Sequence, residues 1–388
     1  MRIALLSSDP AVMLGDGHSC PVRMRGLALA LSRAGHEITC IAAAVEPGQG
    51  ELMPELPVRN LRTPVSVREI DWHFSRVGPE VVIERYVPGS LEGVRAAAEA
   101  GIPHVYDIDG PLDAGGLATS SAVRGALPEA FALSRAAIAS SDGAASRVRG
   151  LLGRAFPLAV VPNAAGAEFL EPPAPDLVGR IEEQLCLQDG ALRVGFFGSL
   201  GAESGLLPLV EAMGSLGGER RPRLLVVGDG PERNPALRVA EASRASLVLC
   251  GRVAHRDVAA HLALCQIVVA PAGPEGSAPL SMLEAMAMQL AVVAPATDGV
   301  RAVARDGHDA CLFPSGDVAA LASALRSLAG DPARRARLGN HARETVRARH
   351  TWESRTAEVE EFLREVRGVP ESSANGWTAQ PLRRAFSG

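Results

Sequence analysis

The sequence predicts an α/β protein made of two domains, each built on a parallel sheet. Three observations predict this class. Apolar segments that suit strands alternate with amphipathic segments that suit helices along most of the chain. The same strand–loop–helix order restarts after a proline-rich segment near the middle. Finally, a chain of 388 residues is long for a single hydrophobic core.

The N-terminal half begins with the strand RIALLSS and a polar, glycine-containing loop, AVMLGDGHSCP. The helix VRMRGLALALSRAGH follows, and Gly35 is expected to end it before the strand EITCIAAA. Arg23, on this helix, is expected to be solvated. Further strands are predicted at EVVIERY, PHVYDID and AAIAS, whereas the segment 45–60 has the composition of a loop.

The domain boundary is predicted at PNAAGAEFLEPPAPD, residues 162–176, which contains four prolines and no periodicity. Beyond it come the strands LRVGFFGS, RLLVVGDG, LVLCGRV, QIVVAPAG and AVVAP, with helices between them, and a helical pattern from Val318 to about Arg349. We therefore expect one domain over residues 1–165 and a second over 166–351. A helix over 352–370 is expected to cross back to the first domain, and a disordered tail to follow over 371–388.

Composition excludes several function classes. The net charge is −5 and the pI about 6, so no overall positive field would attract nucleic acid or a membrane surface. All 39 basic residues are arginine, which removes lysine from any site. The six cysteines form no CxxC pair, as in reduced cytosolic proteins, and no apolar run approaches the length of a membrane span. These features predict a cytoplasmic protein without a transmembrane segment.

Two strand–loop–helix segments have the composition of ligand sites. In GFFGSLGAESGLLPLVEAM, Gly198, Gly201 and Gly205 would let a ligand approach the backbone at a helix N-terminus, or would simply form a tight turn. In GSAPLSMLEAM, the N–H groups of Ser277, Ala278 and Leu280 open a second helix. Glu284, on that helix, could accept a pair of ribose hydroxyls, or could be favoured only by the positive helix end.

A family resemblance covers residues 1 to about 365. The segment LVLCGRVAHRDVAAHLALCQIVVAPAGPEGSAPLSMLEAMAMQLAVVAP resembles glycosyltransferases of family 4 with the GT-B fold. The following stretch from DGHDACLFPSGD to HTWE is similar to the same family, as are VVPN, VVGDGPE and, in the first half, VVIERY with PHVYDIDGPL. The resemblance implies two Rossmann-like domains with parallel sheets that face each other across a cleft.

The resemblance also implies an activity. Such enzymes transfer a sugar from a nucleotide-diphosphate donor, here UDP- or GDP-linked, usually with retention and without a metal or other cofactor. The acceptor would be a small molecule or glycan with a hydroxyl or thiol group, with natural-product biosynthesis as the candidate setting, and nucleic acid would not be a partner. The alternatives are a silent nucleotide-sugar-binding protein of the same fold and another chemistry of that fold, such as an epimerase or a phosphorylase. The oligomeric state is left open.

Site residues follow from positions that match the family motifs. Glu284 would hold the ribose, and Gly228 would lie in a loop beside the nucleotide. Arg252 and Val253 would flank the base. Further donor-side positions are Gly17, Gly198, Ser199, Gly276, Ser277, Ala278 and Leu280. Candidate catalytic groups on the acceptor side are Asp107, Asp109 and His18; the alternative for His18 is a surface loop residue.

The sequence departs from the family pattern at charged positions. Gly276 stands where the family has its first glutamate, and Ser199 and Ser204 stand where an arginine and a lysine usually follow the first strand of the second domain. The family also has a glycine in place of Gln289. His255 is expected to be a helix-cap neighbour that could approach the ligand.

Overall fold

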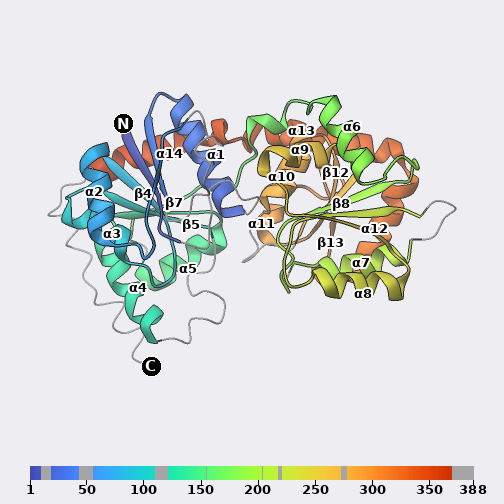
Figure 1. Cartoon of the computed structure of the whole chain (residues 1–388), viewed down its shortest axis with the longest axis horizontal. Helices are drawn as coiled ribbons and strands as arrows, with labels where there is room; N and C mark the ends of the chain where they lie inside the picture. The colour runs from blue at the N-terminus through green and yellow to red at the C-terminus, as the bar shows by residue number, and fades with distance from the viewer. Residues whose placement is uncertain are drawn as a thin grey trace. The chain divides into compact units, whose positions relative to one another are not determined.

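The computed structural model describes residues 1–9, 19–42, 56–109, 121–153, 155–202, 204–216, 221–271 and 278–368. These residues form two compact units. The first contains the described chain up to Pro162 and again from Arg355, and the second runs from Asn163 to Ser354 (Figure 1). The chain passes between units beside the proline-rich segment, where the sequence predicts a boundary.

The first unit is a parallel sheet in the order β3-β2-β1-β4-β5-β6-β7. The strands are β1 (Arg2–Ser7), β2 (Glu37–Ala42), β3 (Val58–Asn60), β4 (Val81–Arg85), β5 (His104–Ile108), β6 (Ala136–Ala139) and β7 (Leu158–Val160). The helices are α1 (Ser19–Arg33), α2 (Val67–Val77), α3 (Glu92–Glu99), α4 (Ser121–Leu133) and α5 (Asp142–Leu152). Strand order reverses between β1 and β4, so ligand-binding residues are expected at the carboxyl ends of these strands.

Local sequence explains the elements that the sequence reading passed over. Helix α2 begins at Ser66, whose side chain accepts the N–H of Glu69, and ends at Gly78 in the left-handed conformation. Strand β3 is short and pairs only with β2, within the segment 45–60 that was expected to be loop. Such edge strands carry little periodicity because only a few residues are paired.

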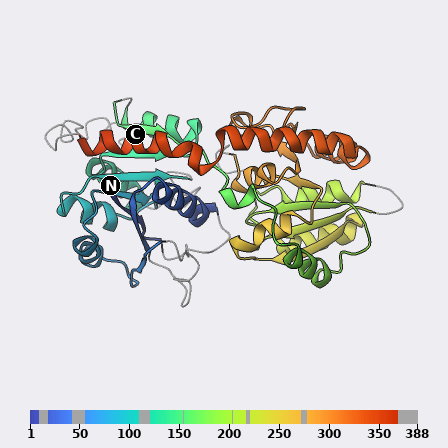
Figure 2. The same cartoon turned by 90° about the horizontal axis from the view of Figure 1, so that it is seen from above.

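Helix α14 (Trp352–Gly368) returns the chain to the first unit. From Arg355 its residues group with that unit, and Figures 1 and 2 show it running along the unit. Two ion pairs hold it there: His36 Nε2 lies 2.8 Å from Glu360 Oε1, and Arg367 Nη1 lies 2.7 Å from Glu80 Oε1.

The second unit is a parallel sheet in the order β10-β9-β8-β11-β12-β13. The strands are β8 (Arg193–Phe197), β9 (Arg223–Val227), β10 (Ser246–Gly251), β11 (Ile267–Val269), β12 (Ala291–Pro295) and β13 (Cys311–Phe313). The helices are α6 (Pro175–Gln184), α7 (Leu206–Gly214), α8 (Arg233–Ser243), α9 (His255–Leu262), α10 (Leu280–Ala287), α11 (Asp298–Arg301), α12 (Val318–Gly330) and α13 (Pro332–Arg349), with a short 3-10 helix, η3 (Ala167–Phe169). The helical pattern from Val318 to Arg349 is thus two helices, because Asp331 caps α13 and Pro332 opens it.

Helix α10 ends at a position where a glycine would be expected. Gln289 follows it with φ of +64°, and its side chain donates a hydrogen bond to Asn340 on α13. Gly339 lies against the backbone of Gln289 so closely that a Cβ there would meet the Gln289 carbonyl oxygen at 2.1 Å. Gln289, which stands where the family has a glycine, thus connects the end of α10 to α13 through its side chain.

Candidate functional site

The order of strands in the second unit reverses between β8 and β11. In open parallel sheets, ligands bind beyond the carboxyl ends of the strands at such a reversal. The loop after β8 and the segment after β11 flank this point. They approach each other closely, because a Cβ added to Gly198 would lie 3.4 Å from Cγ of Pro271.

Two glycines bring the loops after β8 and β9 into direct backbone contact. Gly198 and Gly228 have φ of +154° and +145°. A Cβ added to Gly228 would lie only 1.9 Å from the carbonyl oxygen of Gly198. Backbone hydrogen bonds of 3.0 Å, from Gly198 N to Val227 O and from Leu200 N to Asp229 O, join the two loops. Glycine at 228 is required by this approach as well as by its φ.

The serines that replace the family cations have separate surroundings. Ser204 is buried, donates to Glu232 Oε2 at 3.0 Å and accepts the N–H of Leu206 at 3.2 Å. It therefore joins the loop after β8 to Glu232, the residue before α8, and satisfies one N–H at the start of α7. Ser199 is exposed at the same edge.

Glu284 is the buried carboxylate of this unit that the sequence singles out. It lies on α10 with 4% of its surface exposed, and His255 Nε2 lies 2.9 Å from its Oε1. His255 is the first residue of α9, which follows β10. Helices that follow two non-adjacent strands thus meet at this pair.

The entry to α10 is fixed by a side chain from the domain boundary. Asn163 is buried, and its Nδ2 donates to the carbonyl oxygen of Ala278 at 3.2 Å. Pro279 follows as the N-cap of the helix, and Leu280, its first residue, is buried. The sequence does not predict this contact, because nothing local to Asn163 indicates a partner 115 positions along the chain.

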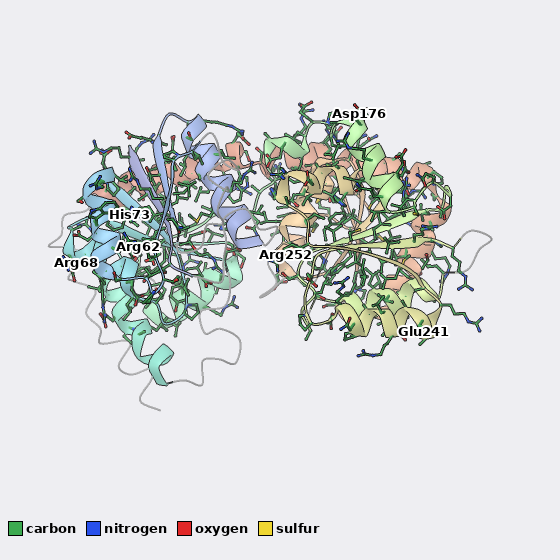
Figure 3. All side chains as sticks on the ribbon, viewed as in Figure 1. Arg62, Arg68, His73, Asp176, Glu241 and Arg252 are labelled. Carbon is green, nitrogen blue, oxygen red and sulfur yellow. The ribbon has the colours of Figure 1, made fainter. Side chains whose placement is uncertain are left out.

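The positions expected beside the base follow β10. Arg252 is exposed and is labelled in Figure 3, whereas Val253 is half-buried against the core. Four other sequence-predicted site residues, Gly17, His18, Gly276 and Ser277, lie outside the described residues. Their proposed roles stay predictions.

Arg23 is not solvated, contrary to the sequence expectation. Its side chain is 1% exposed and forms a two-pronged ion pair with Asp107: Nη2 to Oδ1 at 2.8 Å, and Nε to Oδ2 at 3.0 Å. The pattern of α1 could not show this, because the partner comes from β5. Asp107, proposed from the family pattern as a catalytic group, is therefore engaged by a buried guanidinium.

Asp109 lies two residues beyond Asp107 and is the more accessible of the two carboxylates, being only partly buried. Desolvation raises the pKa of its carboxyl from 3.8 to about 6. The Arg23 guanidinium lowers the pKa of Asp109, and so does a hydrogen bond with Ser140. The charge of Asp107 raises this pKa further. A carboxyl with such a pKa can hold or release a proton near neutrality.

The described residues contain no group of three or more histidine, cysteine, aspartate or glutamate side chains that could hold a metal ion. Within the same residues, no helix is long and apolar enough to cross a membrane.

A strand-order reversal, glycine-mediated loop contacts and a buried carboxylate near a helix start are features that nucleotide-binding α/β units share. Comparison with known proteins finds a family model that matches part of the second unit. Residues 191–331 match the model described as "Glycosyl transferases group 1". The two units have the GT-B fold of the similar solved structures, and the segment that matches this family model lies in the second unit.

Two curated relatives match part of the chain. Alpha-D-kanosaminyltransferase of Streptomyces kanamyceticus is 26% identical over 191 residues, which are 48% of this chain and 48% of that protein. D-inositol 3-phosphate glycosyltransferase of Stackebrandtia nassauensis is 37% identical over 188 residues, 45% of this chain and 42% of that protein. The chain therefore aligns with rather less than half the length of each.

Similar solved structures cover nearly the whole chain. Anabaena HepE, in complex with UDP and glucose, has a TM-score of 0.77 at 18% identity and covers 94% of this chain and 99% of its own. Sucrose-phosphate synthase of Thermosynechococcus elongatus has a TM-score of 0.74 at 20% identity and covers 94% and 98%. At these identities the likeness shows the fold.

Proposed function

We propose that this chain is a glycosyltransferase that takes a sugar from a nucleoside-diphosphate donor. The observation that carries the proposal is Glu284: a buried carboxylate on the helix that opens beside the strand-order reversal, in the segment that matches the group 1 glycosyl transferases. An ionised carboxylate accepts hydrogen bonds and donates none, which suits it to a pair of ribose hydroxyls. UDP-glucose is bound by one structural neighbour, HepE, which supports a nucleotide-sugar ligand here.

The diphosphate would be held at the same edge. The chain has no lysine, and Ser204 is engaged by Glu232. We therefore assign the phosphates to the backbone N–H groups at the starts of α7 and α10, where helix ends favour negative charge, with Arg252 as the nearby cation at this edge. Transfer would proceed with retention and without a metal, through loss of the diphosphate and attack of the acceptor on the same face.

The acceptor side is assigned to the first unit. Asp109 lies beyond the carboxyl end of β5, and the pKa of its carboxyl is raised to about 6. It is our choice for the group that accepts a proton from, or hydrogen-bonds to, the acceptor hydroxyl. We extend the proposal to a role in natural-product biosynthesis.

The test is nucleotide binding followed by turnover. UDP and GDP are titrated by calorimetry into the wild type, Glu284→Ala and Glu241→Ala; Glu241, labelled in Figure 3, is an exposed glutamate on α8 of the same unit. Loss of the carboxylate should weaken binding about tenfold or more, because hydrogen bonds to a charged group are worth about 1.5–3 kcal/mol. The Glu241 variant should bind as the wild type does. Failure of the wild type to bind either nucleotide would refute the proposal.

A second function has its own support. The two serines at the usual cationic positions, one of them engaged by Glu232, favour a protein that binds a nucleotide-sugar without transferring the sugar. Release of free nucleoside diphosphate from UDP- or GDP-sugars, in the presence of an acceptor panel, distinguishes the two. Binding without release across the panel would favour the silent protein.

A further inference from the structure

We propose that His255 is a positioning residue for ribose recognition: it holds one oxygen of Glu284 so that the other faces the nucleotide. This inference rests on the proposed function, because it concerns the same ligand. It adds a residue that the family pattern did not assign to the ribose.

The hydrogen bond fixes the roles of the two side chains. Oε1 of Glu284 lies 2.9 Å from Nε2 of His255, and an ionised carboxylate can only accept. Nε2 of His255 therefore carries the hydrogen and donates it. Both side chains are largely buried, with 10% and 6% of their surfaces exposed for His255 and Glu284 respectively.

The second oxygen of Glu284 remains open. Among the described residues, His255 is the only partner of this carboxylate. The Glu284 side chain keeps 6% of its surface exposed. This arrangement leaves one acceptor atom oriented and unused.

The imidazole is itself held in place. The ring of Phe169 packs against it at a centroid distance of 5.4 Å and an interplanar angle of 63°. Phe169 is 1% exposed and lies in η3, shortly after the boundary between the units. His255 is thus fixed between an immobile aromatic ring and the carboxylate, which limits the rotation of the Glu284 side chain.

Positioning is the effect that follows from this geometry. An unrestrained glutamate side chain samples several rotamers, and ordering it on binding reduces affinity. With Oε1 held, the donor would meet a carboxylate already in its bound orientation. Loss of the imidazole should therefore weaken the ribose contact specifically and leave contacts to the base and phosphates unchanged.

The test measures the ribose contact separately from the rest of the nucleotide. Dissociation constants are determined for UDP, 2′-deoxy-UDP, GDP and 2′-deoxy-GDP with the wild type, His255→Ala, His255→Gln and Glu284→Ala. The ratio of the deoxy to the ribose constant reports the contact. His261→Gln is the matched control, because His261 lies on the same helix and bonds to the Asp257 carbonyl instead.

The wild type should discriminate by about tenfold, as expected for hydrogen bonds between a charged group and a hydroxyl. His255→Ala should reduce the ratio to about two- or threefold without weakening 2′-deoxynucleotide binding, and Glu284→Ala should reduce it to about one. His255→Gln, which can place an amide N–H near the same point, should restore much of the ratio. His261→Gln should keep it.

The outcomes separate this inference from the proposed function. If the wild type binds no nucleotide, the proposed function is wrong and this inference with it. If the wild type and Glu284→Ala show the same ratio, the ribose assignment is wrong, and so is the role of His255. If Glu284→Ala loses discrimination while a folded His255→Ala keeps the full ratio, only the role of His255 is overturned. Should His255→Ala fail to fold, His255→Gln decides: weaker binding of all four nucleotides alike would contradict positioning.

Discussion

Replacing Asp107 by alanine should act mainly on the stability of the first unit. The side chain of its partner, Arg23, is 1% exposed and that of Asp107 is 8% exposed, with the shortest N–O distance at 2.8 Å. Removing the carboxylate takes away the group that pairs with the buried Arg23 guanidinium at 2.8 Å. Breaking a buried pair in this way costs about 3–5 kcal/mol. This is a large part of the roughly 5–15 kcal/mol that stabilises a typical domain.

The assay is urea denaturation of four proteins, with midpoint and slope read separately. They are the wild type, Asp107→Ala, Arg23→Met and the double variant Arg23→Met/Asp107→Leu. Each single variant should lose several kcal/mol of unfolding free energy, because each leaves one buried charge. The double variant should recover most of the loss, since apolar replacement of a whole buried pair is often near neutral. The recovery measures the coupling between the two residues.

Two results would refute this reasoning. An Asp107→Ala protein within about 1 kcal/mol of the wild type would show that the pair is unimportant for folding, in conflict with the cost expected for a buried charge. If that protein also lost turnover, Asp107 would act in catalysis, as the family pattern suggests. A double variant no more stable than either single variant would show that the two side chains contribute independently.

Three further predictions concern single positions. Since the folded-state pKa of Asp109 is about 6 against an ordinary 3.8, the folded protein binds more protons between these values. Wild-type unfolding free energy should therefore fall, by at most about 3 kcal/mol, as pH rises from about 4 to 6. In Asp109→Asn this contribution should be absent, and denaturation across that pH range measures the difference. Gly228→Ala should lower the melting temperature and weaken UDP binding, because its Cβ would lie 1.9 Å from a backbone oxygen. Arg244→Gly should raise unfolding free energy by about 0.5–1 kcal/mol, because Arg244 ends α8 with φ of +59°.

Each of these has a control or a contradicting result. For Asp109, parallel pH profiles of the wild type and the asparagine variant would show that its pKa is not raised. Gly201→Ala, in the same loop as Gly198 but with open space where its Cβ would lie, should leave stability nearly unchanged. A Gly228→Ala protein as stable as Gly201→Ala would contradict the close approach. For Arg244, a loss of stability would mean that its side-chain contacts outweigh the backbone strain.

Part of the candidate site could be predicted from the sequence. The rest could not, for a physical reason. Glu284 could be selected from the sequence, since a single carboxylate in an otherwise apolar helix start requires a partner. Its partner could not, because His255 belongs to a helix that follows a different strand, and strand order is needed to bring the two together. The same holds for Asn163, whose contact with Ala278 joins residues 115 positions apart.

The sequence by itself determined the α/β class and the repetition of the strand–loop–helix order in two halves with parallel sheets. These follow from the period of apolar residues, from prolines and glycines, and from the order of elements, all of which are local properties of the chain. Only the tertiary structure decided which charges are neutralised and which remain open to a ligand. The pattern of its helix predicts a solvated Arg23, but in the folded protein β5 places Asp107 beside this side chain. In the second unit, α9 places one hydrogen-bond donor, His255, beside Glu284. Burial and charge pairing depend on distances between elements far apart in sequence, and those distances are set when the sheets assemble.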